Sequence, residues 1–293
     1  MAERFYKIGG FKVAYTVAQL CPRRAVHWFA ERVALAGAAR RPAARAAMLE
    51  NLRFALGSPP EELERMYLQG IRNFGRMLGD YFITAGGRRD RLEPLFDTSS
   101  GWEHVEAARA KGRGVILVTG HLGHWELGAQ WLARCGVLPT VVTLPEPSPE
   151  LSRWRCSARR QLGIGTLEVG PGREFSFVEM LAVLRRNEVL AVLVDRPYGG
   201  TGLTVRQFGQ ETQFSMAAAM LAHHSGAAVI PAFVVAQPSW RYESMALAEV
   251  PMEVGALRKT MQPNTQRIAE TFESLIRRYP EQWFNYVPLY TRP

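Results

Sequence analysis

The stretch Val115-Ile116-Leu117-Val118-Thr119-Gly120-His121-Leu122-Gly123-His124-Trp125-Glu126 decides the fold. Its first half is an apolar, largely β-branched run bounded by glycines, which is typical of a central parallel strand covered on both faces. Its second half brings a histidine to the carboxyl end of that strand, where ligands and chemistry gather in open α/β sheets. The stretch therefore predicts a buried strand over 114–119 followed directly by a functional loop.

The spacing of His121 and Glu126 carries a mechanical prediction. Residues five apart on one helix lie about 140° apart around its axis, so these two do not share a helix face. They can meet if His121 lies in the loop and Glu126 lies in the first turn of a helix that begins at Trp125. A carboxylate that accepts the Nδ1 proton of an imidazole frees Nε2 as a general base, and we expect Glu126 to play this part. A hydrogen-bonded structural histidine is the alternative.

Strands and helices alternate from Gly101 onward. We predict strands over 114–119, 137–143, 164–169, 189–194, 203–208, 227–235 and 241–249, and helices over 102–111, 125–134, 149–162, 174–187, 214–225 and 264–278. This order predicts an α/β fold with a mixed, mainly parallel central sheet flanked by helices. The 293 residues suit one continuous folded unit, with a helical membrane-associating region over 1–95 and an α/β catalytic core over 96–293.

The net charge of +9 is concentrated near the start of the chain, where residues 1–60 hold ten Lys or Arg against three Glu. Between Phe11 and Leu20 the polar residues form a narrow stripe on a wide apolar face, and helical spacing resumes after Cys21-Pro22. No run reaches the ~18 uninterrupted apolar residues that span a bilayer. We expect an amphipathic helix pair lying on an anionic membrane surface, with simple coverage of the sheet as the alternative.

Two further groups of polar residues are candidates for the site. The strand over 189–194 ends in Asp195-Arg196-Pro197-Tyr198-Gly199, so Asp195 and Arg196 face the same cleft as His121 if the two strands are neighbours. A simple strand-to-turn junction is the alternative. The helix over 149–162 carries four arginines, which suit a phosphate-bearing substrate because Arg binds phosphate through two hydrogen bonds. A solvated helix face is the alternative there.

Several chemistries are disfavoured by missing motifs. The chain has no G-x-S-x-G elbow, no P-loop and no G-x-G-x-x-G, so a serine hydrolase or a nucleotide-binding protein is not supported. The three cysteines form no Cys-x-x-Cys, and the pairs His121-x-x-His124 and His223-His224 lack a third ligand. We therefore expect no metal, and a reducing, cytoplasm-facing location.

Taken together, the His-x4-Glu after one strand, the Asp-Arg-Pro-Tyr-Gly after another and the basic amphipathic N-terminal region resemble the bacterial late acyltransferases of lipid A biosynthesis. These lauroyl and myristoyl transferases lie within the glycerolipid acyltransferase superfamily, with its His-x4-Asp/Glu motif. The resemblance extends to Asn73-Phe74-Gly75-Arg76 and Tyr279-Pro280-Glu281-Gln282-Trp283. The chain departs from the family at Pro197, where a second acid is common, and in the residues after Trp283. These departures concern lipid A as the acceptor more than they concern catalysis.

The resemblance implies an O-acyltransferase that moves a fatty acyl chain from acyl-ACP or acyl-CoA to a hydroxyl of a membrane lipid. His121 would be the base and Glu126 its support, Arg153, Arg159 and Arg160 would hold acceptor phosphates, and Asp195 and Arg196 would line the cleft. The expected partners are a lipid acceptor, acyl carrier protein or CoA as cosubstrate, and an anionic membrane, without nucleic acid or another cofactor. The implied location is the cytoplasmic face of the bacterial inner membrane, as a peripheral or monotopic protein.

Two other functions are compatible with parts of the sequence. A non-catalytic protein that docks on anionic membranes or nucleic acid explains the basic N-terminal region but leaves the cleft motifs without a role. A lipid esterase uses the same site, with water in place of the acceptor hydroxyl.

Overall fold

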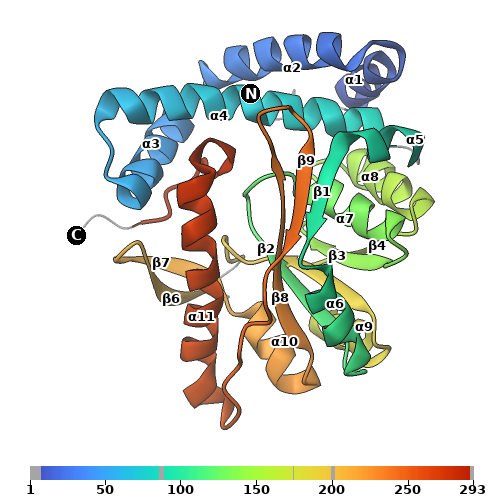
Figure 1. Cartoon of the computed structure of the whole chain (residues 1–293), viewed down its shortest axis with the longest axis vertical. Coiled ribbons are helices and arrows are strands. Elements are labelled where there is room, and N and C mark those ends of the chain that lie inside the picture. Colours follow the sequence, from blue (N-terminus) through green and yellow to red (C-terminus); the bar gives the residue numbers. More distant parts are fainter. Residues whose placement is uncertain (1–7, 86–88, 174, 199–201, 291–293) are drawn as a thin grey trace.

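A computed structural model describes residues 8–85, 89–173, 175–198 and 202–290 (Figure 1). Seven strands form one sheet in the order β1-β9-β8-β2-β5-β3-β4, and β6 and β7 form a separate hairpin. The strands are β1 (Phe96–Ser100), β2 (Val115–Thr119), β3 (Pro139–Thr143), β4 (Gly165–Glu168), β5 (Val189–Leu193), β6 (Gly202–Gln207), β7 (Gln210–Ser215), β8 (Ala228–Ala236) and β9 (Tyr242–Ala246). Only the pairing of β8 with β9 is antiparallel within the large sheet, which confirms a mixed, mainly parallel sheet.

The order of the strands places β2 between β8 and β5 in the middle of the sheet. In this register Leu117 lies opposite Ala191 and Thr119 lies opposite Leu193. The two strand ends that carry His121 and Asp195 are therefore adjacent, as the sequence predicted. The structure excludes a separation of these two groups across the sheet.

Helices cover both faces of the sheet and one of its ends (Figure 1). They are α1 (Ile8–Leu20), α2 (Arg23–Ala38), α3 (Pro42–Leu56), α4 (Pro60–Thr84), α5 (Arg89–Leu92), α6 (Trp102–Ala110), α7 (Trp125–Arg134), α8 (Pro149–Gln161), α9 (Ser176–Arg185), α10 (Ala217–Ser225) and α11 (Leu257–Arg278). Short 3-10 helices lie at Glu93–Leu95 and Pro280–Gln282. Figure 1 shows α2 and α4 side by side across the end of the sheet.

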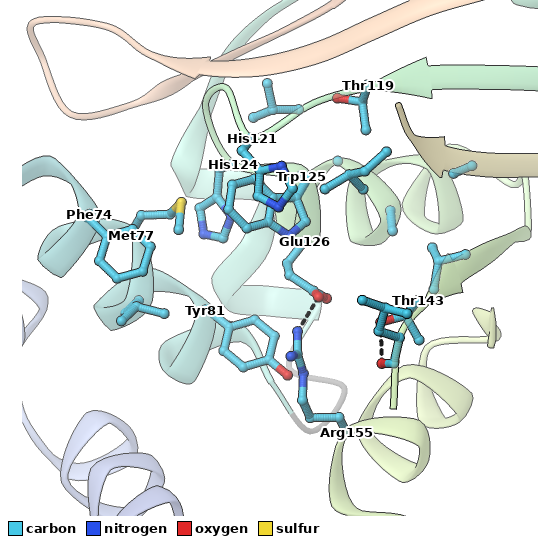
Figure 2. A pocket seen from close by; sticks show the side chains of 18 of the residues that line it. Phe74, Met77, Tyr81, Thr119, His121, His124, Trp125, Glu126, Thr143 and Arg155 are labelled. Atoms are coloured by element: carbon cyan, nitrogen blue, oxygen red, sulfur yellow. Dashed lines mark hydrogen bonds and ion pairs between the residues drawn. The ribbon is translucent and has the colours of Figure 1, made fainter. Parts of the chain in front are cut away.

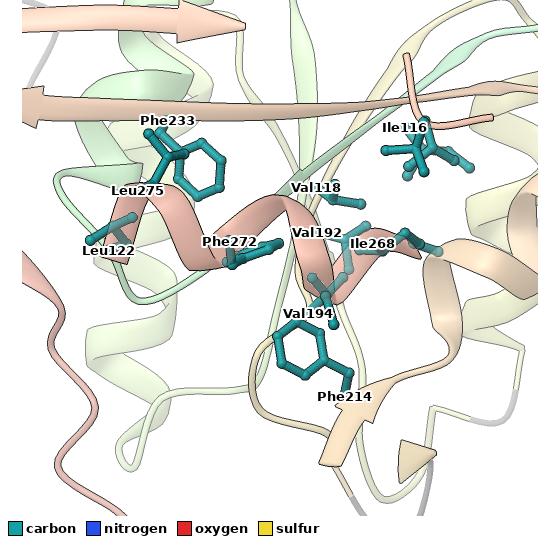
Figure 3. Close-up of a cluster of buried hydrophobic side chains, with 14 of the residues drawn as sticks. Ile116, Val118, Leu122, Val192, Val194, Phe214, Phe233, Ile268, Phe272 and Leu275 are labelled. Carbon is teal, nitrogen blue, oxygen red and sulfur yellow. The ribbon is translucent and has the colours of Figure 1, made fainter. Parts of the chain in front are cut away.

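The largest buried core lies between the sheet and helices α9, α10 and α11 (Figure 3). Phe272 of α11 is in edge-to-face contact with both Phe214 and Phe233, with ring centroids 5.5 and 5.1 Å apart. The opposite face has a smaller core with α6, which includes Val105. Because β2 contributes side chains to both cores, it is buried on both faces, as its continuous apolar run predicted.

Most of the predicted elements are confirmed within two or three residues at each end. The first exception is β1, a polar edge strand in which only Phe96 is buried, so it lacks an apolar pattern. The second is β7, which pairs with β6 through a tight turn at Phe208 and Gly209, both with positive φ. Helix α11 also begins at Leu257 and continues through Pro263, where a proline would normally end a helix. Positions 174 and 199, which the predictions included, lie outside the described residues.

The two predicted N-terminal helices are present as α1 and α2, separated at Cys21 and Pro22. Among the described residues, no helix combines the length and the apolar character needed to cross a membrane. Helices α3 and α4 pack into the main core through Leu52 and Ile71, so the N-terminal helices share a core with the sheet.

Candidate active site

His121 follows β2 in a tight loop, and α7 begins four residues later at Trp125. Two glycines make this loop possible. At position 120, a methyl group would come within 2.9 Å of the carboxyl carbon of Asp195. At position 123, φ is +66° and a methyl group would come within 2.0 Å of the Val234 carbonyl oxygen. The loop therefore fits closely between β5 and β8.

The Asp195 carboxylate holds His121 at two points. One carboxylate oxygen lies 2.8 Å from Nδ1 of the imidazole, and the other accepts the backbone N–H of His121, also at 2.8 Å. The His121 side chain keeps 22% of its surface exposed, whereas the Asp195 side chain keeps 5%. The imidazole thus has one fixed edge and one edge that faces open space.

The ionisation of Asp195 decides which nitrogen of His121 carries the proton. Burial would raise the pKa of Asp195, but the charge and hydrogen bonds of His121 outweigh it and hold the pKa at about 2. An ionised carboxylate only accepts hydrogen bonds, so in a neutral imidazole the proton must lie on Nδ1. Nε2 is then unprotonated and able to accept a proton.

A segment near the end of the described chain completes this arrangement. The Asn285 amide donates to Asp195 at 3.0 Å, while its oxygen accepts from the guanidinium of Arg196. Phe284 donates its backbone N–H to the His121 carbonyl oxygen at 2.6 Å. Arg196 also donates to the Phe284 carbonyl oxygen at 2.6 Å, so its charge is used within the protein.

Glu126 occupies the first turn of α7 as predicted, but its expected contact with His121 is wrong. Two arginines of α8 hold its carboxylate: Arg155 forms an ion pair with it, and Arg159 donates to it at 2.5 Å. Burial would raise the pKa of Glu126, but these two positive charges hold it at about 2. Asp195, rather than Glu126, is the carboxylate that orients the imidazole, because β5 lies directly beside β2.

The predicted arginines separate into two groups. Arg159 is buried against Glu126, whereas Arg153 and Arg160 are exposed and do not line the cavity beside His121. Arg153 lies 3.5 Å from Glu150 on the same helix. The helix turns these two side chains outward, so the expectation that they contact the substrate at this site is wrong.

A large, mostly apolar cavity of about 1600 Å³ opens beside His121. Small-molecule pockets usually measure about 300 to 1,000 Å³, so this one has room for long hydrocarbon chains. Figure 2 shows Phe74 and Met77 on one side of the pocket and Arg155 reaching Glu126 on another. The site therefore joins one accessible base to an extended apolar space.

Two residues of the site went unpredicted as individuals. Arg155 was one of four arginines on a helix, and only the three-dimensional pairing with Glu126 and Glu146 distinguishes it. Asn285 lies 90 residues from Asp195, and no local pattern links them. For Arg155, the one available signal was that it lies four residues before Arg159, which places both on one helix face.

The fold and site are those of an acyltransferase: the chain matches the family model of the bacterial lipid A biosynthesis acyltransferases over residues 9–291, and so belongs to that family. Among its relatives is a phosphatidylinositol mannoside acyltransferase of Mycobacterium tuberculosis. The two are 28% identical over 239 residues, which cover 80% of this chain and 73% of the relative. A phosphatidylinositol mannoside acyltransferase of Mycolicibacterium smegmatis is 26% identical over 253 residues, which cover 84% of this chain and 81% of the relative.

Proposed function

We propose that the protein transfers a fatty acyl chain from a CoA or acyl carrier protein thioester to a hydroxyl of a membrane lipid, with His121 as the general base. The acceptor is a lipid A precursor or a related glycolipid or phospholipid. The observation that carries the proposal is the His121–Asp195 pair, whose accessible Nε2 lies beside a large apolar cavity. The family match and the relatives support the same reaction class.

The transfer is a direct attack. Nε2 of His121 takes the proton of the acceptor hydroxyl as its oxygen forms a bond to the thioester carbonyl carbon. The carbon–sulfur bond breaks when the tetrahedral intermediate collapses, and the departing thiolate recovers the proton from the imidazolium. Asp195 remains ionised throughout and stabilises the imidazolium as it forms. No nucleophilic side chain of the protein is needed.

The acceptor reaches the site from an anionic membrane in this proposal. Val13 and Val17 of α1 and Phe29 and Val33 of α2 line the cavity and are also exposed on the surface. The mouth of the cavity is therefore apolar along these helices, and exposed Arg24 lies on the same helix pair. Apolar side chains combined with basic ones bind membranes that contain anionic lipids.

The test is a transfer assay with palmitoyl-CoA and phosphatidylinositol mannoside in mixed micelles, read by thiol release and by mass spectrometry of the lipid product. We expect the acceptor to be required for thiol release. His121→Ala should lower turnover by about 10² to 10⁴. Asp195→Asn should lower it by a comparable factor, because an amide stabilises the wrong imidazole tautomer.

Glu126→Gln is the comparison variant, since its carboxylate contacts arginines rather than the base. It should cost less activity than either of the other two changes. Wild-type turnover by His121→Ala, or a larger loss in Glu126→Gln than in Asp195→Asn, would contradict the assigned roles. Thiol release that is independent of any acceptor lipid would instead indicate an esterase.

A further inference from the structure

The cavity continues past His121 into a space between the sheet and helices α6 and α7, which we call the sheet–helix arm. On the sheet side it is lined by Leu117 and its partner Ala191, and by Ala232 and its partner Ala246. Three of these four side chains are methyl groups. Protein interiors leave few voids larger than a water molecule, so a gap of this kind calls for an occupant.

Helix α7 forms the opposite wall of the sheet–helix arm. Trp125, Gly128, Ala129 and Leu132 line the cavity, and their spacing places them along one face of the helix. The Trp125 ring lies 5.3 Å from the His121 ring, measured between centroids. The wall is therefore continuous from the catalytic histidine to Leu132, and the middle of it is again made of small residues.

The sheet–helix arm has a closed end. Trp102 and Val105 of α6 line it there, whereas Val115 and Ile230, one row further along the sheet, are fully buried and do not line the cavity. The start of α6 is tightly fixed, because a methyl group at Gly101 would lie 1.8 Å from the Ala246 carbonyl oxygen. Trp102 therefore sits on a backbone that has little freedom to withdraw.

We propose that the sheet–helix arm holds the acyl chain of the donor and that Trp102 and Val105 limit its length. This inference rests on the proposed function, which requires the thioester carbonyl beside His121. A saturated hydrocarbon makes no hydrogen bonds, and the arm offers it two walls of small apolar residues. A chain that reaches α6 meets the indole of Trp102, so longer chains no longer fit with their carbonyl at the base.

The cavity also has walls on the opposite face of the sheet, at Phe177, Met180 and Met220. These long side chains fill much of their own space, and the nearby lining includes the charged Arg173. The sheet–helix arm is the better fit because its walls lack both large side chains and charge beyond Glu126. Met220 supplies a comparison for the test.

The experiment measures transfer from a series of acyl-CoA donors, octanoyl to stearoyl, by full-length wild type and variants. Ala232→Leu narrows the sheet–helix arm, and we expect roughly ten-fold or greater loss with the longest accepted donors and little change with octanoyl-CoA. Trp102→Ala opens the closed end and should move the preferred donor to a longer chain. Ala107→Leu, an exposed change on α6, should keep the wild-type profile.

The outcomes separate the inference from the proposed function. Wild type that transfers no donor at all contradicts the proposed function. Active wild type with the same chain-length profile in Ala232→Leu and Trp102→Ala overturns the inference alone. A profile that changes with Met220→Trp, but not with Ala232→Leu, places the chain on the other face and also overturns it. If Ala232→Leu melts below the assay temperature, Trp102→Ala carries the test.

Discussion

The catalytic pair depends on how closely two strand ends approach each other. Asp195 accepts hydrogen bonds from the imidazole of His121, from the backbone of His121 and from Asn285. These contacts fix both the position and the rotation of the ring. Gly120 sits between them, and its missing side chain is what lets the carboxylate reach the loop.

Gly120→Ala should therefore damage catalysis without removing a catalytic group. The added methyl group would lie 2.9 Å from the Asp195 carboxyl carbon and 2.7 Å from the Phe272 ring. We expect kcat to fall by about 10²-fold, since a displacement near 1 Å can cost that much. Overpacking should also lower the unfolding free energy by about 1–3 kcal/mol. Gly9→Ala, which meets nothing within 4 Å, is the control. Unchanged kcat in Gly120→Ala would refute this role.

Helix α7 begins with an unusual cap. Nδ1 of His124 accepts the backbone N–H of Leu127 at 3.3 Å, so the imidazole is neutral when it caps the helix. Burial lowers the pKa of His124 to about 4, although the charges of Asp80 and Glu126 oppose this shift. The start of the helix that carries Glu126 and Trp125 therefore depends on a histidine without its second proton.

The sign of the pH effect follows from that lowered pKa. The unfolded chain protonates His124 near pH 6.5, before the folded protein does, so stability falls as the pH drops from 6.5 toward 4. We expect a loss of roughly 2–3 kcal/mol over that window from this group. His124→Asn keeps a capping side chain and removes the titration. Urea unfolding at pH 7 and pH 4.5 should show a shallower pH dependence in the variant; identical slopes would exclude His124 as the source.

Periodicity predicts what is local and misses what is assembled. The runs in β2 and β5 were recognisable because burial on both faces leaves few polar residues, and their adjacency brought His121 and Asp195 together. The partner of Glu126 was not predictable, because an ion pair with Arg155 on another helix leaves no trace in spacing. Strand β1 escaped for the opposite reason: its exposed edge tolerates polar residues.

At the scale of the whole molecule, a buried polar cluster attaches the helix pair α1–α2 to the rest of the fold. Asp80 of α4 pairs with Arg23 and His27 of α2 and accepts the hydroxyl of Tyr242 from β9. Burial would raise the pKa of Asp80, but hydrogen bonds from Arg23 and His27 hold it at about 2. The exposed apolar side chains of these helices are thereby held in a fixed relation to the cavity.

Membrane binding through α1 and α2 gives a prediction at this scale. Leu20 and Trp28 are 79% and 60% exposed. Replacing both with Glu removes apolar contact and adds negative charge, so we expect cosedimentation with phosphatidylglycerol vesicles to weaken by about ten-fold or more. Wild type should bind these vesicles more strongly than phosphatidylcholine vesicles. Val254→Glu, at an exposed apolar position outside these helices, is the control. Equal binding by all three proteins would argue against this surface.

The clamp on the His121 loop has a consequence for how activity arises during folding. Gln282 and Phe284 bond to the backbone on either side of Leu122, and Asn285 reaches Asp195 from 90 residues away. Contacts between such distant parts of a chain are costly in entropy to close, and they tend to form after local structure. A chain that has folded its sheet but has not yet docked this segment would be compact and silent. Competence to react with a thioester therefore arrives as one of the last events of folding.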